Sequence, residues 1–170
     1  MSCCVNFKDK ISSKSNSYIK RSFDIALRLL KDGNVILSKK VKIYITADIP
    51  DNIEQLLDSL NSEMVELKIF KKLSLQDYND IFETCNVGLS LKLKSGIYSS
   101  TTFPSKVIEI VSSNKLLIST NLLDLNHIFS SNSVLYCDDT GYDLAKQIQR
   151  LSKMDENTFS EYVNSANSDV

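Results

Sequence analysis

The sequence is poor in residues that break regular structure, and it carries no excess charge of either sign. It contains 4 glycines and 2 prolines, which argues against a β-sandwich with many loops. Its 20 Lys and Arg nearly balance its 21 Asp and Glu, so it lacks the basic excess typical of binders of duplex DNA or anionic membranes. No apolar run approaches the roughly 20 residues that cross a bilayer. We therefore expect no nucleic-acid partner and at most a peripheral membrane association.

Metal and disulfide chemistry have few candidate residues. The only histidine is His127, and the 4 cysteines form no C-x-x-C pair, so no zinc site is expected. Adjacent Cys3 and Cys4 are a poor start for a disulfide framework, while Cys85 and Cys137 lie in apolar segments and resemble small core residues. The first ten residues hold no apolar stretch that would serve as a secretory signal. These features predict a cytoplasmic protein without metal or cofactor.

Strand-like and helix-like segments alternate at least five times along the chain. Runs rich in β-branched or apolar residues predict strands near 5–7, 41–47, 65–70, 87–91, 115–120 and 133–137. Amphipathic patterns between them predict helices, with N-caps at Asp51, Ser74 and Thr140 and left-handed stops at Gly33 and Asn114. Such alternation requires crossover connections, which give a parallel sheet covered on both faces. We expect one doubly wound, Rossmann-like α/β domain over residues 1–170, with about six mainly parallel strands.

The segment that follows the strand at 87–91 offers the best candidate for a binding site. A polar loop over 92–103 leads into a helix that Pro104 would begin. Unpaired N–H groups at a helix start favour anions such as phosphate. Hydroxyls and a positive charge are added by Thr101, Thr102, Ser105 and Lys106. Glu109 shares a helical face with Ser105, so its carboxylate would accept hydrogen bonds from a sugar diol. The alternative is an ordinary capped helix with a solvated glutamate.

Phe103 to Thr120 (FPSKVIEIVSSNKLLIST) resembles the donor-site segment of glycosyltransferase family 4 and its GT-B relatives. In those enzymes a proline, a small residue and a lysine precede a glutamate, and a strand ending in threonine follows. The run SLQDYNDIFETCNVGLSL is similar to the helix and strand before this loop, and VNFKDKISSK is similar to the first strand and loop. The resemblance covers roughly Val5 to Ala166 and corresponds to the carboxyl-terminal, donor-binding half of a GT-B enzyme.

This resemblance implies a function and a set of site residues. Glu109 would hold the ribose hydroxyls of a nucleotide-sugar donor, alongside the helix-start residues named above. Lys10 falls where the family has an arginine that meets the donor diphosphate, and Lys14 falls near its companion lysine. The two cations would be the catalytic groups, because they oppose charge that builds on the leaving diphosphate without a metal. The implied reaction is sugar transfer, with retention, to an acceptor glycan or lipid-linked sugar in polysaccharide biosynthesis.

The acceptor domain of a GT-B enzyme normally comes first in the chain, and this sequence has room for one domain only. We therefore expect a fragment or one subunit of a split enzyme, which binds donor weakly and does not turn over alone. Three positions depart from the family pattern: Asp9 replaces a glycine, Thr101 replaces a frequent glutamate, and Leu122-Leu123 replace two glycines. These departures favour a second hypothesis, a catalytically inactive binding or interaction module. A phosphoacceptor receiver domain fits less well, because only Asp9 represents its acidic cluster.

Overall fold

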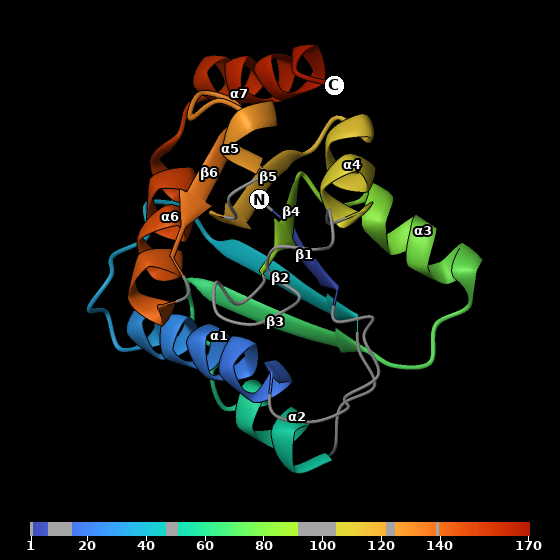
Figure 1. The fold of residues 1–170 in the computed structure, drawn as a ribbon. Helices are drawn as coiled ribbons and strands as arrows, with labels where there is room; N and C mark the ends of the chain where they lie inside the picture. The colour runs from blue at the N-terminus through green and yellow to red at the C-terminus, as the bar shows by residue number, and fades with distance from the viewer. Residues whose placement is uncertain (1, 7–14, 47–50, 92–104, 122–124, 139) are drawn as a thin grey trace.

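The computed structural model describes residues 2–6, 15–46, 51–91, 105–121, 125–138 and 140–170 (Figure 1). They form one six-stranded parallel sheet flanked by helices. The strands are β1 (Ser2–Asn6), β2 (Val41–Thr46), β3 (Val65–Phe70), β4 (Val87–Ser90), β5 (Leu116–Thr120) and β6 (Val134–Cys137). The helices are α1 (Ser15–Lys31), α2 (Asp51–Asp58), α3 (Leu75–Glu83), α4 (Ser105–Ser112), α5 (Leu125–Ile128), α6 (Gly141–Lys153) and α7 (Glu156–Ser168).

The order of the strands reverses in the middle of the sheet. Across the sheet the order is β3-β2-β1-β4-β5-β6, so the chain builds outwards from β1 to one edge and then returns to β1's other side. In the register, Val5 of β1 lies between Ile45 of β2 and Leu89 of β4. The expected doubly wound, Rossmann-like α/β fold is therefore confirmed. In such folds ligands bind beyond the carboxyl ends of the strands at the reversal, here those of β1 and β4.

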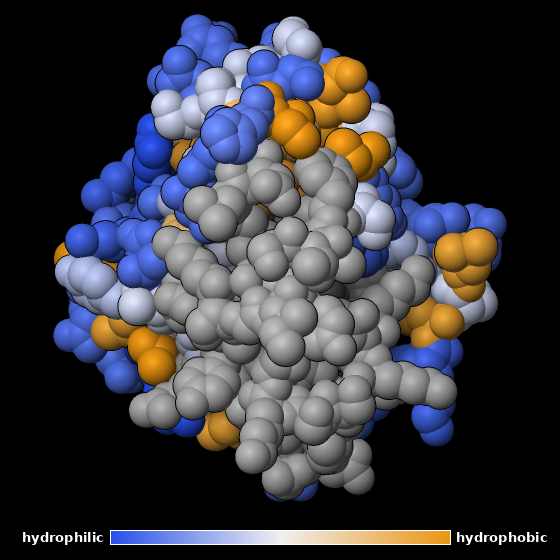
Figure 2. All heavy atoms as spheres, in the orientation of Figure 1, coloured by the Kyte–Doolittle hydropathy of each residue, from blue (hydrophilic) through white to orange (hydrophobic). Residues whose placement is uncertain are grey.

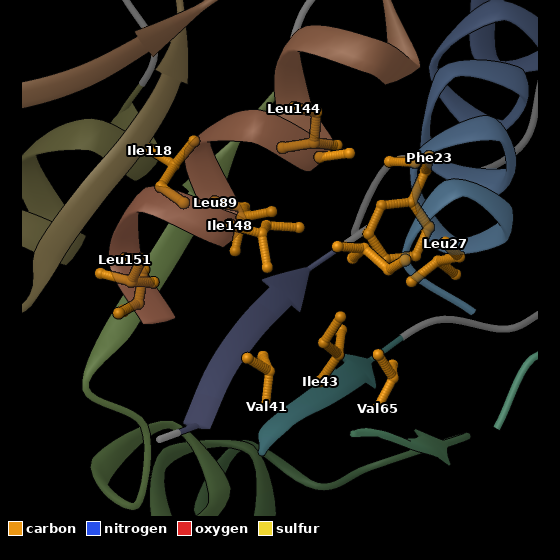
Figure 3. Close-up of a cluster of buried hydrophobic side chains, with 14 of the residues drawn as sticks. Phe23, Leu27, Val41, Ile43, Val65, Leu89, Ile118, Leu144, Ile148 and Leu151 are labelled. Atoms are coloured by element: carbon orange, nitrogen blue, oxygen red, sulfur yellow. The ribbon is translucent and has the colours of Figure 1, made fainter. Parts of the chain in front are cut away.

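Hydrophobic side chains fill both faces of the sheet. On one face Phe23 and Leu27 of α1 and Ile148 of α6 pack with the sheet (Figure 3). On the other face α3, α4 and α5 form a second cluster. Within β5, Leu117 belongs to the second cluster and Ile118 to the first, as the alternation of side chains along a strand requires. Every residue of β5 is buried, including the polar Ser119, whose hydroxyl donates to the carbonyl of Ser90 at 3.1 Å.

Local capping signals in the sequence mostly matched the structure. Ser74 accepts a hydrogen bond from the backbone N–H of Asp77 at the start of α3, and Thr140 does the same for Asp143 at α6. Gly33 and Asn114 adopt positive φ angles of 72° and 54° after their helices. Helix α4 begins at Ser105, so the helix predicted after Pro104 is confirmed. The side chain of Asp51, the third predicted N-cap, lies outside the described residues.

The cysteines follow the sequence prediction only in part. Cys137 is buried in the core with a free thiol, as expected. Cys85 is equally buried, but it is disulfide-bonded, whereas its apolar surroundings had predicted a small core residue with no bridge. A hydrophobic pattern predicts that a cysteine is buried, but it does not predict which distant cysteine lies close enough to form a disulfide with it.

The described surface is mainly hydrophilic (Figure 2), in keeping with the balanced charge of the sequence. Apolar side chains show at the outer end of α3, where Leu75 is exposed. None of the described helices combines the length and apolarity that a membrane span requires.

Helices α1 and α6 touch through a glycine, and this contact can be tested. A Cβ added at Gly141 would lie 2.3 Å from the carbonyl oxygen of Ser22 and 2.5 Å from Cβ of Ile25. Gly141→Ala therefore forces the helices apart, and we expect the free energy of unfolding to fall by about 2 kcal/mol in urea denaturation. Lys153→Ala, at an exposed position of the same helix, is the control and should stay within about 0.5 kcal/mol of the parent. Equal stability of the two variants would show that this contact is loose.

Candidate functional site

The candidate site lies where β4 leads towards α4. Strand β1 ends at Asn6 and β4 at Ser90, and these neighbouring strands mark the reversal of the sheet. Of the residues predicted for the site, the structure describes Ser105, Lys106 and Glu109 in α4. Five predicted site residues lie outside the described part of the chain: Lys10, Lys14, Thr101, Thr102 and Pro104. The same holds for the departures at Asp9 and Leu122-Leu123.

Helix α4 sits unusually close to the sheet. Its apolar side chains Val107, Ile110 and Val111 are buried, and a Cβ at Gly88 of β4 would lie 2.5 Å from Cγ1 of Ile110. Glycine at this position therefore lets the helix pack directly on the strand. Because Lys106 and Glu109 are three residues apart, they emerge together on one edge of the packed helix.

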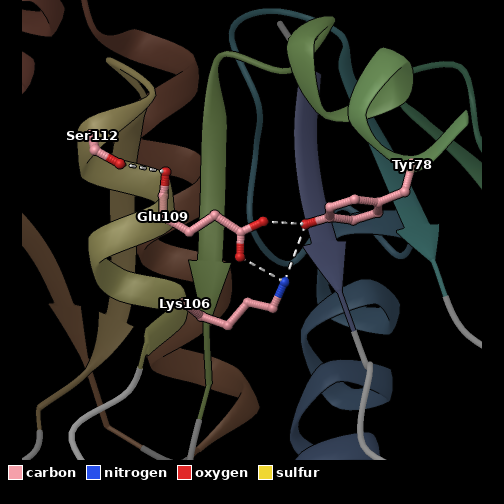
Figure 4. A network of polar contacts seen from close by, with 4 residues as sticks. All are labelled: Tyr78, Lys106, Glu109 and Ser112. Atoms are coloured by element: carbon pink, nitrogen blue, oxygen red, sulfur yellow. Dashed lines mark hydrogen bonds and ion pairs between the residues drawn. The ribbon is translucent and has the colours of Figure 1, made fainter. Parts of the chain in front are cut away.

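Lys106, Glu109 and Tyr78 form a closed polar network between α4 and α3 (Figure 4). The ammonium of Lys106 donates to Oε2 of Glu109 and to the hydroxyl of Tyr78, both at 3.1 Å. The Tyr78 hydroxyl donates to the other carboxylate oxygen, Oε1, at 3.0 Å. Ser105 begins the helix and is exposed. The structure therefore brings two predicted site residues together, with a third residue that the prediction had not assigned to the site.

A cavity opens beside this network. It is lined by the three network side chains and by Thr46, Phe82, Leu89 and Ile110. Phe82, Leu89 and Ile110 are apolar and buried, so the cavity joins an apolar wall to a charged rim. The hydroxyl of Thr46 is buried there, and the described residues supply it with no hydrogen-bond partner. With a volume of about 10 Å³, the cavity has room for little more than one water molecule, so a larger ligand would have to bind against its open, charged rim.

Sequence reasoning missed the parts that Tyr78 and Thr46 play in this site. Tyr78 was assigned to the buried face of its helix, and it is indeed 7% exposed. A tyrosine on a buried face needs a partner for its hydroxyl, and this rule was the available signal. Thr46 is the last residue of β2 and lies within the strand predicted over 41–47, and nothing in the sequence marks it. His127, the only histidine of the sequence, lies exposed on the short helix α5.

The described residues hold no group of three or more His, Cys, Asp or Glu side chains arranged as a metal site. Among the described residues of the site, the charged groups are one ammonium and one carboxylate, both partly exposed: their side chains are 27% and 40% accessible. Both therefore remain within reach of a polar ligand.

No protein-family model matches the sequence, and no curated protein matches it. Solved structures match its fold. Anabaena HepE (Alr3699) in complex with UDP-glucose superposes with a TM-score of 0.64 at 12% identity, over 98% of this chain and 43% of its own. An E. coli trehalose-6-phosphate structure bound with UDP-2-fluoro glucose gives 0.61 at 12% identity, over 98% and 39%. A putative UDP-N-acetylglucosamine 2-epimerase from Listeria monocytogenes gives 0.58 at 8% identity, over 98% and 39%.

These matches concern the fold. The chain has the Rossmann-like fold found in GT-B enzymes. The fold that the sequence resemblance implied is therefore confirmed. The chain spans only about two fifths of the length of these structures, between 39 and 43%. The names attached to this fold include an epimerase as well as proteins bound to UDP-sugars, so the reaction has to be argued from the site.

Partial exposure of the network predicts that it adds little to stability. Lys106→Met should change the free energy of unfolding by less than about 1 kcal/mol, because a water-exposed ion pair gains little from its charges. Lys115→Met is the matched control: this buried lysine donates to the carbonyl of Cys85 at 2.9 Å, and its loss should cost about 1–3 kcal/mol. Urea denaturation measures both. A loss above 2 kcal/mol for Lys106→Met would assign the network a structural role instead.

Proposed function

We propose that this chain is the donor-binding domain of a glycosyltransferase, which transfers a sugar from a nucleotide-sugar to an acceptor glycan or lipid-linked sugar. The observation that carries the proposal is the pairing of Lys106 and Glu109 on the first turns of α4, beside the carboxyl end of β4 at the strand reversal. Solved structures with this fold hold UDP-glucose or UDP-2-fluoro glucose, which supports a nucleotide-sugar as substrate rather than a separate cofactor.

The donor's ribose is assigned to Glu109. Each carboxylate oxygen accepts one hydrogen bond within the network, which leaves each oxygen able to accept another. The two neighbouring hydroxyls of a ribose can each donate one hydrogen bond to these two carboxylate oxygens. The free N–H groups of the α4 start and the Ser105 hydroxyl suit the diphosphate, since that end of a helix is partially positive. Thr101, Thr102 and Pro104 precede it directly in the sequence.

The chemical step needs positive charge opposite the leaving group. As the glycosidic bond breaks, negative charge builds on the nucleoside diphosphate, and fixed cations lower the barrier. Lys10 and Lys14 follow β1 in the sequence, and β1 pairs with β4, so loops after these strands start from the same edge of the sheet. We assign the catalytic charge to these two lysines, with no metal. Retention of configuration belongs to this proposal as well.

The proposal includes a missing half. Residues 1–170 would be a single nucleotide-sugar-binding domain, and the acceptor would be held by a second domain or a partner subunit. The isolated chain would then bind donor without turning it over. It would act in the cytoplasm, where nucleotide-sugars are available, with at most a peripheral contact with a membrane.

A catalytically inactive binding module is the second candidate. It is favoured by the substitutions at Asp9, Thr101 and Leu122-Leu123, because bulky or acidic side chains hinder approach to a diphosphate. In the complete protein, Glu109→Ala separates the two: loss of transfer supports the enzyme, and unchanged behaviour supports the module.

Donor binding can be measured by calorimetric titration of the purified chain with UDP-, GDP- and ADP-glucose. We expect one of them to bind, and Glu109→Ala to weaken it about 10- to 100-fold, since hydrogen bonds to a charged group are worth about 1.5–3 kcal/mol. Glu161→Ala, which removes an exposed glutamate on α7, should bind like the parent. Absence of heat with all three compounds would remove the main support for donor binding.

A further inference from the structure

Tyr78 occupies a position that packing alone does not explain. Its ring is buried in α3 and stacks on the ring of Phe82, with centroids 5.8 Å apart and planes 12° from parallel. Its hydroxyl nevertheless leaves the apolar cluster and meets the charged pair on α4 (Figure 4). A phenylalanine would fill the same volume, so the hydroxyl itself needs an explanation.

The hydrogen bonds within the network have a fixed direction. An ionised carboxylate only accepts and an ammonium only donates, so the Tyr78 hydroxyl must give its single proton to Glu109 and accept from Lys106. The two carboxylate oxygens are consequently held from two separate elements, α3 through Tyr78 and α4 itself through Lys106. This fixes the plane of the carboxylate, which Lys106 alone would leave free to turn.

The two side chains differ in burial. Tyr78 is 7% exposed and held by ring stacking, while the side chain of Glu109 is 40% exposed. A glutamate restrained in advance loses less rotamer entropy when a ligand binds, and preorganisation of this kind raises affinity. The buried, stacked tyrosine therefore restrains the more exposed glutamate.

We propose that Tyr78 is a positioning residue that orients the Glu109 carboxylate to receive both hydroxyls of a ribose, and so makes the site selective for ribonucleotides over deoxyribonucleotides. This inference rests on the proposed function, because it assumes that the ligand is a nucleotide. It goes further in naming what sets the selectivity: a residue of α3 that does not itself contact the sugar.

The test compares Tyr78→Phe with the parent, using the tightest-binding of UDP, GDP and ADP and its 2′-deoxy analogue. We expect the parent to prefer the ribonucleotide by about 10-fold or more, from one hydrogen bond to a charged group. In Tyr78→Phe the ribonucleotide should bind about 3- to 10-fold more weakly, as expected when one further side chain has to be ordered on binding. The deoxy analogue should change less than about 2-fold, so the preference shrinks. Tyr142→Phe, which changes an exposed tyrosine of α6, should leave both affinities unchanged.

A second comparison separates positioning from a general structural effect. In a Glu109→Ala background, Tyr78→Phe should have no further effect on nucleotide affinity, because the residue it positions is gone. Equal weakening of ribonucleotide and deoxy analogue, a further loss in the Glu109→Ala background, or tighter binding by Tyr78→Phe would each overturn the inference. A parent that binds no nucleotide would overturn the proposed function and this inference with it. A parent that binds ribonucleotides with unchanged preference in Tyr78→Phe overturns this inference alone.

Discussion

The contact between Gly88 and Ile110 determines where the site can be. Because β4 carries no side chain at this point, α4 rests directly on the sheet, and its polar edge is held next to α3. That spacing puts a tyrosine hydroxyl 3.0 Å from a carboxylate oxygen, a distance that leaves little tolerance for a shift of either helix. The polar network is therefore a consequence of how closely a helix and a strand pack.

Features that depend on residues close in the sequence were predicted, whereas contacts between residues far apart in the sequence were not. Strands such as β5 and the caps at Ser74 and Thr140 depend on neighbouring residues and on the period of the apolar pattern, so they were predicted. The pair of Lys106 and Glu109 was also within reach, because three residues separate them on one helix. The link to Tyr78 joins residues 31 positions apart, and the disulfide at Cys85 likewise needs a partner elsewhere in the chain. Such contacts exist only once the helices have packed, so no local pattern encodes them.

The fold indicates where a ligand would bind, whereas the side chains of the site indicate which chemistry it could support. Solved structures at 8–12% identity share the architecture while their names cover an epimerase and proteins holding UDP-sugars. These structures share a parallel sheet, and in such folds ligands bind in the loops beyond the carboxyl ends of the strands. The assignment of chemistry to this chain rests on its own carboxylate, ammonium and phenol, since these side chains are what a ligand would meet.

The central place of β1 in the sheet also bears on how the protein is made. Strand β1 pairs with β2 on one side and with β4 on the other, and residues 87–90 of β4 are synthesised much later than β1. Until they emerge, the nascent half-sheet of β1, β2 and β3 presents an unpaired edge, which is a template for association with other chains. The central place of β1 thus makes solubility during synthesis depend on the prompt arrival of a segment some eighty residues downstream.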